Sequence, residues 1–252
     1  MDYSIRERLE IEATKYPAKC CLPIFIAEPP KNNSEIHNGT VSFYRSNTHL
    51  IGITCNHIIE EYQSLKNNKS DALIQIGNHR INLEGNLIDQ NQKLDLATFK
   101  FSNSDYQKMK EQNNGTGEII PSIISSQLNT SDHIAFGGFI GEWVSRPEKN
   151  TLIFDTFSIG DTQIVTVEED QFSCRIDNLK NYKEVFNYFN RSEPKNIGGL
   201  SGGPILKIIQ NQSGIIHWEL AGIIYEGRYD SGTLKLYGRF AKLIQDNGKI
   251  KV

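Results

Sequence analysis

The sequence has little that points to a membrane, a metal or a polyanionic partner. Only four of its 252 residues are cysteine and none forms a C-x-x-C pair, which argues against a structural zinc site and a disulfide-rich secreted scaffold. No apolar run approaches the length of a membrane span, and residues 1–17 carry charges throughout instead of the apolar core of a secretory signal. The 27 basic and 30 acidic residues give a formal charge of -3 with no long block of one sign. We therefore expect a cytoplasmic protein with free thiols, no cofactor, no metal, and no nucleic-acid or membrane partner.

Short segments rich in β-branched and aromatic residues fill most of the chain. Clusters of Asn, Gly, Ser and Lys separate them, as expected for strands at hairpin spacing. A polar stretch between residues 107 and 117 divides the segments into two sets, which favours an all-β protein with two barrels or sandwiches. The predicted parts are an N-terminal helix at 1–17, a first barrel at 18–110, a linker at 111–124, a second barrel at 125–240, and a C-terminal helix and tail at 241–252.

The two terminal helices are predicted from local signals. Ser4 and Glu7 fit a capping box, and Pro17 is expected to end the first helix. The segment "RFAKLIQDNG" is expected to form a closing helix, with Gly248 near its C-terminal end.

The segment "GGLSGGPI", residues 198–205, places Ser201 among glycines directly before an apolar run. Glycine lets another group approach the main chain closely. A serine hydroxyl becomes a good nucleophile only when a base takes its proton and a carboxylate orients that base. His57, at the end of the apolar stretch "GITCNHII", and Asp95, at the head of "LDLATFKF", are the candidates. Alone, His57 reads as an ordinary histidine and Asp95 as a strand cap or a lysine partner, with Asp89 close enough to compete.

The motifs "TCNH", "DLAT" and "GLSGGP", in the order His57, Asp95, Ser201, resemble the trypsin-like serine protease superfamily, in its bacterial cytoplasmic type. The segment "DHIAFGGFIG" is similar to the stretch that leads into the second barrel of bacterial high-temperature-requirement-type proteases. The resemblance spans about residues 20 to 245 and implies two six-stranded antiparallel Greek-key β-barrels. It also implies a serine endopeptidase that forms an acyl-enzyme on Ser201, with His57 as base, Asp95 as its orienting group, and the N–H groups of Gly199 and Ser201 as the oxyanion hole.

The resemblance extends to residues that would bind a peptide substrate. The segment "GIIYEG" resembles the family strand that pairs with the substrate backbone, which implies this role for Tyr225, Glu226 and Gly227. The pocket for the residue before the scissile bond would be lined by Lys195, Gly198 and Leu236. Lys195 disfavours a basic substrate residue. Two preferences stay open: Lys195 would attract an acidic side chain by charge complementarity, whereas Leu236 would narrow the pocket towards small apolar residues.

The chain departs from the family pattern beside two of these residues. Leu200 occupies the position where secreted members have an aspartate that pairs with a newly released N-terminus. Ile58 replaces a cysteine that commonly follows the histidine, and Cys55 lies on the other side. We therefore expect activity without N-terminal processing, under the control of an activating partner protein, as in relatives that resemble effectors of bacterial defence.

Two other functions remain open from the sequence. An inactive homologue could keep the groove around residues 225–227 as a peptide-binding module. An esterase of the α/β-hydrolase type requires alternating strands and helices and the order Ser, Asp, His, and neither is found.

Overall fold

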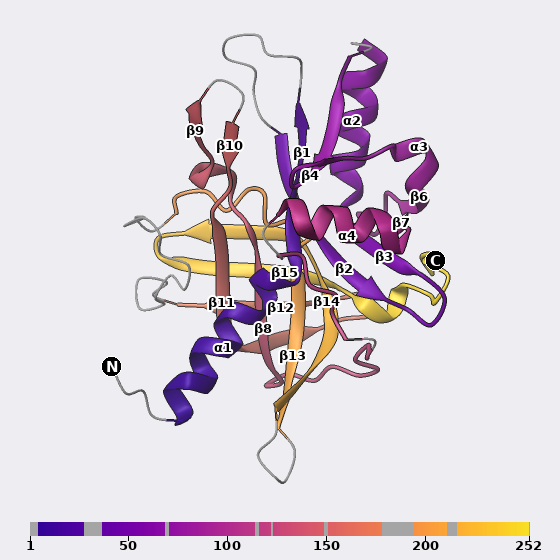
Figure 1. Cartoon of the computed structure of the whole chain (residues 1–252). Coiled ribbons are helices and arrows are strands. Elements are labelled where there is room, and N and C mark those ends of the chain that lie inside the picture. Colours follow the sequence, from indigo (N-terminus) through magenta and orange to yellow (C-terminus); the bar gives the residue numbers. More distant parts are fainter. Residues whose placement is uncertain are drawn as a thin grey trace.

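Two curved antiparallel sheets, one from each half of the chain, make up most of the structure (Figure 1). The computed structural model describes residues 5–27, 37–68, 71–113, 116–121, 123–148, 151–177, 194–210 and 216–251. Within these ranges, no helix combines the length and the apolar character needed to cross a membrane. The prediction of an all-β fold in two halves is confirmed.

The first unit is a seven-stranded sheet with the order β5-β4-β1-β2-β3-β7-β6. Its strands are β1 (Cys21–Ala27), β2 (His37–Arg45), β3 (Leu50–Thr54), β4 (Leu73–Ile76), β5 (His79–Arg80), β6 (Leu87–Asn91) and β7 (Leu96–Phe101). Three helices connect them or follow them: α2 (Asn56–Asn68), α3 (Leu83–Asn86) and α4 (Asn103–Gln112). Six strands in a closed barrel were expected, but β5 adds a seventh and no pairing joins β5 or β4 to β6 among the described residues.

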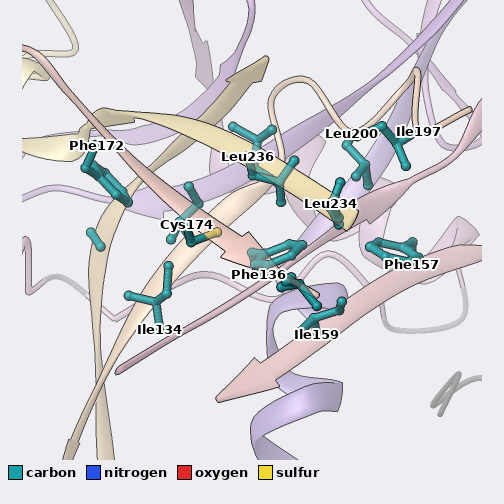
Figure 2. Packing of buried hydrophobic residues seen from close by; sticks show 14 of the residues in the cluster. Ile134, Phe136, Phe157, Ile159, Phe172, Cys174, Ile197, Leu200, Leu234 and Leu236 are labelled. Atoms are coloured by element: carbon teal, nitrogen blue, oxygen red, sulfur yellow. The ribbon is translucent and has the colours of Figure 1, made fainter. Parts of the chain in front are cut away.

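The second unit is a closed barrel with the order β11-β12-β15-β14-β13-β8, so its expected six strands are confirmed. The strands are β8 (His133–Phe139), β11 (Thr156–Val167), β12 (Gln171–Ile176), β13 (Pro204–Gln210), β14 (Ile216–Asp230) and β15 (Thr233–Phe240). A hairpin of β9 (Ser145–Glu148) and β10 (Thr151–Ile153) projects from the barrel (Figure 1). Alternate residues of the strands fill the barrel interior, among them Phe136, Phe172 and Leu236 (Figure 2).

A separate apolar cluster fills the seam between the two units. Strand β3 is buried along its whole length because Leu50 faces the first unit's core while Ile51 and Ile53 face the seam. Across the seam they share a cluster with Leu206 and Ile223 of the second unit. Each such side chain removed from water stabilises the fold by roughly 1.5–3 kcal/mol, so the seam holds the units together.

The chain end crosses the seam and binds the first unit. After the 3₁₀ turn η3 (Ala241–Leu243) the backbone turns at Gly248, whose φ is +83°, and the Gly248 carbonyl accepts a hydrogen bond from Thr98 Oγ1 at 2.7 Å. Ile244 and Ile250 form a bridge and are buried in the seam cluster. The expected C-terminal helix is therefore wrong beyond one turn, because burying these two isoleucines favours a turn over a helix.

Helix α1 (Ile5–Lys19) packs on β8 and β11 of the second unit (Figure 1). Its backbone comes so close that a Cβ added at Gly160 would lie 2.7 Å from Thr14 N. Ser158 Oγ donates a hydrogen bond to the Thr14 carbonyl. The helix continues past Pro17, where we expected it to end, and Cys20 N closes the last turn on the Pro17 carbonyl at 3.1 Å. Residues 1–4, which include Ser4 of the predicted capping box, lie outside the described residues.

Candidate active site

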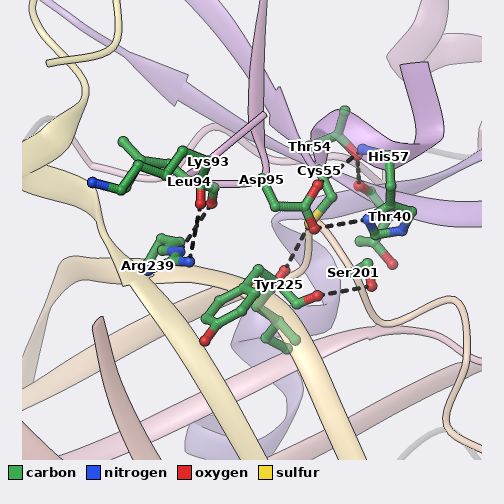
Figure 3. A network of polar contacts seen from close by, with 11 residues as sticks. Thr40, Thr54, Cys55, His57, Lys93, Leu94, Asp95, Ser201, Tyr225 and Arg239 are labelled. Atoms are coloured by element: carbon green, nitrogen blue, oxygen red, sulfur yellow. Dashed lines mark hydrogen bonds and ion pairs between the residues drawn. The ribbon is translucent and has the colours of Figure 1, made fainter. Parts of the chain in front are cut away.

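His57, Asp95 and Ser201 meet at the seam, the first two from the first unit and Ser201 from the second (Figure 3). His57 is the second residue of α2, Asp95 ends the turn before β7, and Ser201 lies in the turn before β13. We expected His57 at the end of a strand, but β3 stops at Thr54 and a helix begins two residues later. Ile58, Ile59 and Tyr62 form the buried face of this helix.

Asp95 holds His57 with both carboxylate oxygens. His57 Nδ1 lies 2.8 Å from Asp95 Oδ2, and the His57 backbone N–H donates to Asp95 Oδ1 at 2.9 Å. The turn presents the carboxylate with φ of +52° at Asp95, and the flanking Leu94 and Leu96 are buried. Two contacts to one residue fix both the ring orientation and the nitrogen that faces the carboxylate.

The hydrogen bond to Asp95 raises the pKa of His57 above its ordinary value, and the charges of Asp95, Glu61 and Glu60 act in the same direction, while burial opposes them. The imidazole therefore accepts a proton readily and keeps it to a higher pH. The stability that this pair contributes to folding is present below the ordinary histidine pKa and is lost as the pH rises through the raised value.

The turn that carries Ser201 rests on strand β2 of the first unit. Thr40 N donates to the Ser201 carbonyl at 2.8 Å, and Ser42 Oγ donates to the Gly202 carbonyl at 2.7 Å. Gly202 has φ of +93°, and a Cβ added there would lie 1.9 Å from Thr40 O. The glycine is needed because the two units approach each other here through their backbones.

The Ser201 hydroxyl donates to the Tyr225 carbonyl at 3.5 Å. No hydrogen bond joins it to His57 within the described part of the chain. A contact of 3.5 Å is at the weak end of hydrogen-bond geometry, so rotating the hydroxyl away from Tyr225 costs little. Serine–histidine contacts in free enzymes are often loose and tighten only when substrate binds.

The backbone N–H groups of Gly199 and Ser201 have no hydrogen-bond acceptor among the described residues. The amides between and after them are bonded: Leu200 N to Ile197 O, Gly202 N to Ile224 O, and Gly203 N to Leu200 O. Gly199 has φ of +103°, the left-handed region that favours glycine. The two free donors flank the hydroxyl, the arrangement that could bind a negative oxygen.

The loop before Ser201 is anchored by η1 (Gly141–Trp143), a feature that the sequence did not signal. Glu142 Oε2 accepts hydrogen bonds from Lys195 N at 2.8 Å and Asn196 N at 2.7 Å. Gly141 N donates to the Gly198 carbonyl at 2.7 Å. Because N–H and C=O of a trans peptide point in opposite directions, fixing the Gly198 carbonyl turns the Gly199 N–H to the other side of the chain.

The predicted pocket residues lie around this loop. Lys195 and Gly198 are exposed to solvent, whereas Leu236 is buried in the barrel core, with 1 % of its surface exposed. A Cβ added at Gly227 would lie 2.4 Å from Ile197 Cδ1 and 2.8 Å from Leu236 Cδ2. Ile197 therefore fills space between the loop and β14, which the sequence reasoning missed.

Residues 225–227 of β14 lie next to this loop. Pairing of β14 with β13 ends at Ile223, while pairing with β15 continues to Asp230. The register shifts between Ile224 and Glu226, so Tyr225 sits at a bulge with its carbonyl towards Ser201. The Glu226 carboxylate pairs with Arg228. Within the described part of the chain only the β15 side of this stretch is paired, and an unpaired strand edge can bind an extended peptide.

Three groups at the site could serve as metal ligands, since atoms of Cys55, His57 and Asp95 lie within 4.8 Å of one another. Burial raises the pKa of Cys55 well above its ordinary value, which disfavours the thiolate that a metal requires. Its Sγ donates to the Ile224 carbonyl at 3.2 Å. The other two groups are bonded to each other, so the arrangement suits proton transfer better than metal binding. All four cysteines are free, as expected, and all are buried.

The fold and the site together define an all-β protein of two units with a His–Asp pair and a serine at their seam. Searches with the sequence match no protein family and no curated protein. The structure is similar to the Rv3671c protease of M. tuberculosis in its active form (11 % identity, TM-score 0.47, covering 90 % of this chain and 78 % of that one). It is also similar to a serine endoprotease of Yersinia pestis (13 %, 0.49, 96 % and 65 %) and to the thermostable serine protease AL20 of an extremophilic microorganism (12 %, 0.44, 88 % and 91 %). With identities this low, we base the function on the geometry of the site.

Proposed function

We propose that this chain is a serine endopeptidase in which Ser201 attacks the peptide carbonyl and His57 takes its proton. The observation that carries the proposal is the double contact of Asp95 with His57, because it orients the ring and stabilises the imidazolium that forms. The tetrahedral intermediate collapses by breaking the peptide C–N bond, and the His57 imidazolium gives its proton to the leaving amine. Water then attacks the acyl-enzyme on Ser201, with His57 again taking a proton, and the carboxylate product leaves as the proton returns to Ser201.

The free N–H groups of Gly199 and Ser201 support the same proposal. The carbonyl oxygen of the substrate becomes negative in the tetrahedral intermediate, and each N–H that binds it contributes roughly 3 to 4 kcal/mol. The anchored loop holds these donors in place before substrate binds, so no reorganisation is required during the reaction.

The substrate lies as an extended peptide along residues 225–227 in this proposal. Ile197 and Leu236 leave room for a small apolar residue before the scissile bond, and the chain has Lys195, not an acidic residue, at the position that would attract Arg or Lys. Efficient turnover of an arginyl reporter peptide would contradict this specificity.

The chain needs no N-terminal cleavage for activity in this proposal. Leu200 is 2 % exposed and belongs to the barrel core, where no ion pair with a new N-terminus is required (Figure 2). The contacts of Glu142 take over the task of holding the loop. Control by an activating partner, a setting in bacterial defence and a cytoplasmic location remain part of the proposal.

The alternative is a peptide-binding module without turnover, which the bond of the Ser201 hydroxyl to Tyr225 instead of His57 favours. The Ser201→Ala variant separates the two functions. The parent protein, incubated with a mixed proteome, should generate new peptide termini that the variant does not. Equal numbers of termini from both would contradict the proposed function. Labelling of the unprocessed parent by a fluorophosphonate, absent in the variant, tests the nucleophile directly.

A further inference from the structure

Arg239 is a buried cation at the seam, close to the proposed catalytic groups but touching none of them (Figure 3). It lies on β15 of the second unit and is 9 % exposed. A guanidinium in such a place is costly unless its donors are satisfied, and its partners therefore show what it holds.

Arg239 binds the main chain of the turn that carries Asp95. Its Nε donates to the Leu94 carbonyl at 2.9 Å, and its Nη2 donates to the Lys93 carbonyl at 3.4 Å. These are the two residues immediately before Asp95. Because Asp95 has a positive φ, its carboxylate direction depends on how this turn is held.

The same guanidinium binds the second unit on its other side. Its Cζ lies 4.1 Å from the ring centroid of Tyr225, whose carbonyl accepts the Ser201 hydroxyl. Its Nη1 lies 2.9 Å from Asp170 Oδ1 and 3.4 Å from Gln171 Oε1. Gln171 Oε1 also accepts the Tyr225 hydroxyl, so the ring and the guanidinium share one acceptor.

We propose that Arg239 is a positioning residue that sets the Asp95 turn and the Tyr225 strand relative to each other across the seam. The inference rests on the proposed function. In that function Asp95 orients the base His57, the Tyr225 strand lies beside the nucleophile Ser201, and Arg239 joins the two in one network. The planar fork of arginine binds two carbonyls, a carboxylate and a ring face at once, which a lysine ammonium cannot do.

The test compares Arg239→Lys with the parent by nuclear magnetic resonance titration of the His57 ring. Lysine keeps the charge and loses the fork. The groups that face His57 are Asp95, Glu60, Glu61 and the Cys55 thiol, and none of them is altered. We expect the pKa of His57 to fall back towards its ordinary value, because Asp95 is no longer held in line with Nδ1. In an Asp95→Asn background the same substitution should produce no further change.

A matched control is Lys207→Met in the same unit. Lys207 forms a partly buried ion pair with Asp132 at 2.8 Å and also donates to the Gln127 carbonyl. We expect Lys207→Met to lower the melting temperature, as we also expect of Arg239→Lys, but to leave the pKa of His57 unchanged. In the active enzyme, Arg239→Lys should reduce kcat/KM about 10- to 100-fold, because both the Asp95 turn and the substrate-binding Tyr225 strand lose their common contact.

Two outcomes overturn the proposal: identical His57 titrations in the parent and Arg239→Lys, or an equal change in Lys207→Met. If Arg239→Lys does not fold, Gln171→Ala removes the shared acceptor and should move the titration in the same direction by less, and no movement overturns the proposal as well. The titration does not need turnover. An inactive parent that still shows the shift would therefore contradict the proposed endopeptidase while the positioning role stands.

Discussion

The two units arrange their strands in the same order but differ in closure and in what their loops carry. Without β5 and the β9–β10 hairpin, each unit has six strands. Their spatial order is β4-β1-β2-β3-β7-β6 in the first unit and β13-β8-β11-β12-β15-β14 in the second. Counted along the chain within each unit, both orders read 4-1-2-3-6-5. The second closes through the pairing of β14 with β13, whereas the corresponding β6 and β4 of the first are not paired in the described structure. Three helices accompany the open sheet.

The proposed catalytic groups occupy different positions of this common frame. His57 directly follows the third strand of the first unit, and Ser201 directly precedes the fourth strand of the second. Asp95 lies in the turn before β7, the last strand of the first unit. The corresponding turn of the second unit, before β15, contains Ser231 and Gly232. One strand order therefore supports two tasks in the proposed enzyme: the first unit orients a proton acceptor, and the second supplies the nucleophile and the amide donors.

Asp95→Asn tests the task of the first unit and should have the largest effect. An amide cannot hold His57 in the same tautomer, so kcat/KM should fall about 10⁴-fold. Because the neutral imidazole accepts the proton, kcat/KM of the parent should rise with pH through the raised pKa of His57, and the variant should lose this rise from the same range. Rates on an activated ester between about pH 5 and pH 9 provide the measurement, and an unchanged profile would contradict the role of Asp95.

Gly199→Ala tests the task of the second unit. A Cβ at this residue would lie 2.4 Å from Asn38 Nδ2 and 2.6 Å from the Phe139 carbonyl, and φ is +103°. The peptide must move, the Gly199 N–H is displaced, and kcat should fall about 10²- to 10³-fold at every pH, with the midpoint of the profile unchanged.

Gly232→Ala is the control for Gly199→Ala. Gly232 has a similar φ of +86°, but a Cβ there meets nothing within 4 Å. It should cost roughly 1–2 kcal/mol of stability from backbone strain and leave kcat intact. Equal losses of kcat in the two variants would assign the effect to strain instead of to the amide donor.

The sequence predicted the class of fold because short apolar segments and turn residues are local signals. It grouped the three proposed catalytic residues only through the resemblance of their motifs, and their order, to a known superfamily. It also held a signal that we missed: Ile58, Ile59, Tyr62 and Leu65 follow a helical spacing after His57. The contacts of Glu142 and Arg239 left no such signal. Arg239 and Leu94 are 145 positions apart, and neither residue has a local pattern that reveals the other. The prediction of a C-terminal helix was wrong for the same reason, since the seam that buries Ile244 and Ile250 exists only in the folded chain.

Ile197→Ala tests a remaining difference between the units, the small pocket proposed for the second one, and should have the smallest effect. Removing the side chain that contacts Gly227 frees room beside Leu236, so kcat/KM for a leucyl substrate relative to an alanyl one should rise about tenfold. Ile197→Val should shift the ratio less and in the same direction. Ile134→Ala, at a fully buried residue of the same cluster, should destabilise the barrel without changing the ratio. A ratio that stays constant in all three variants would show that Ile197 packs the core and does not shape the pocket, and the preference for small residues would then have to come from Leu236 or from the loop anchored by Glu142.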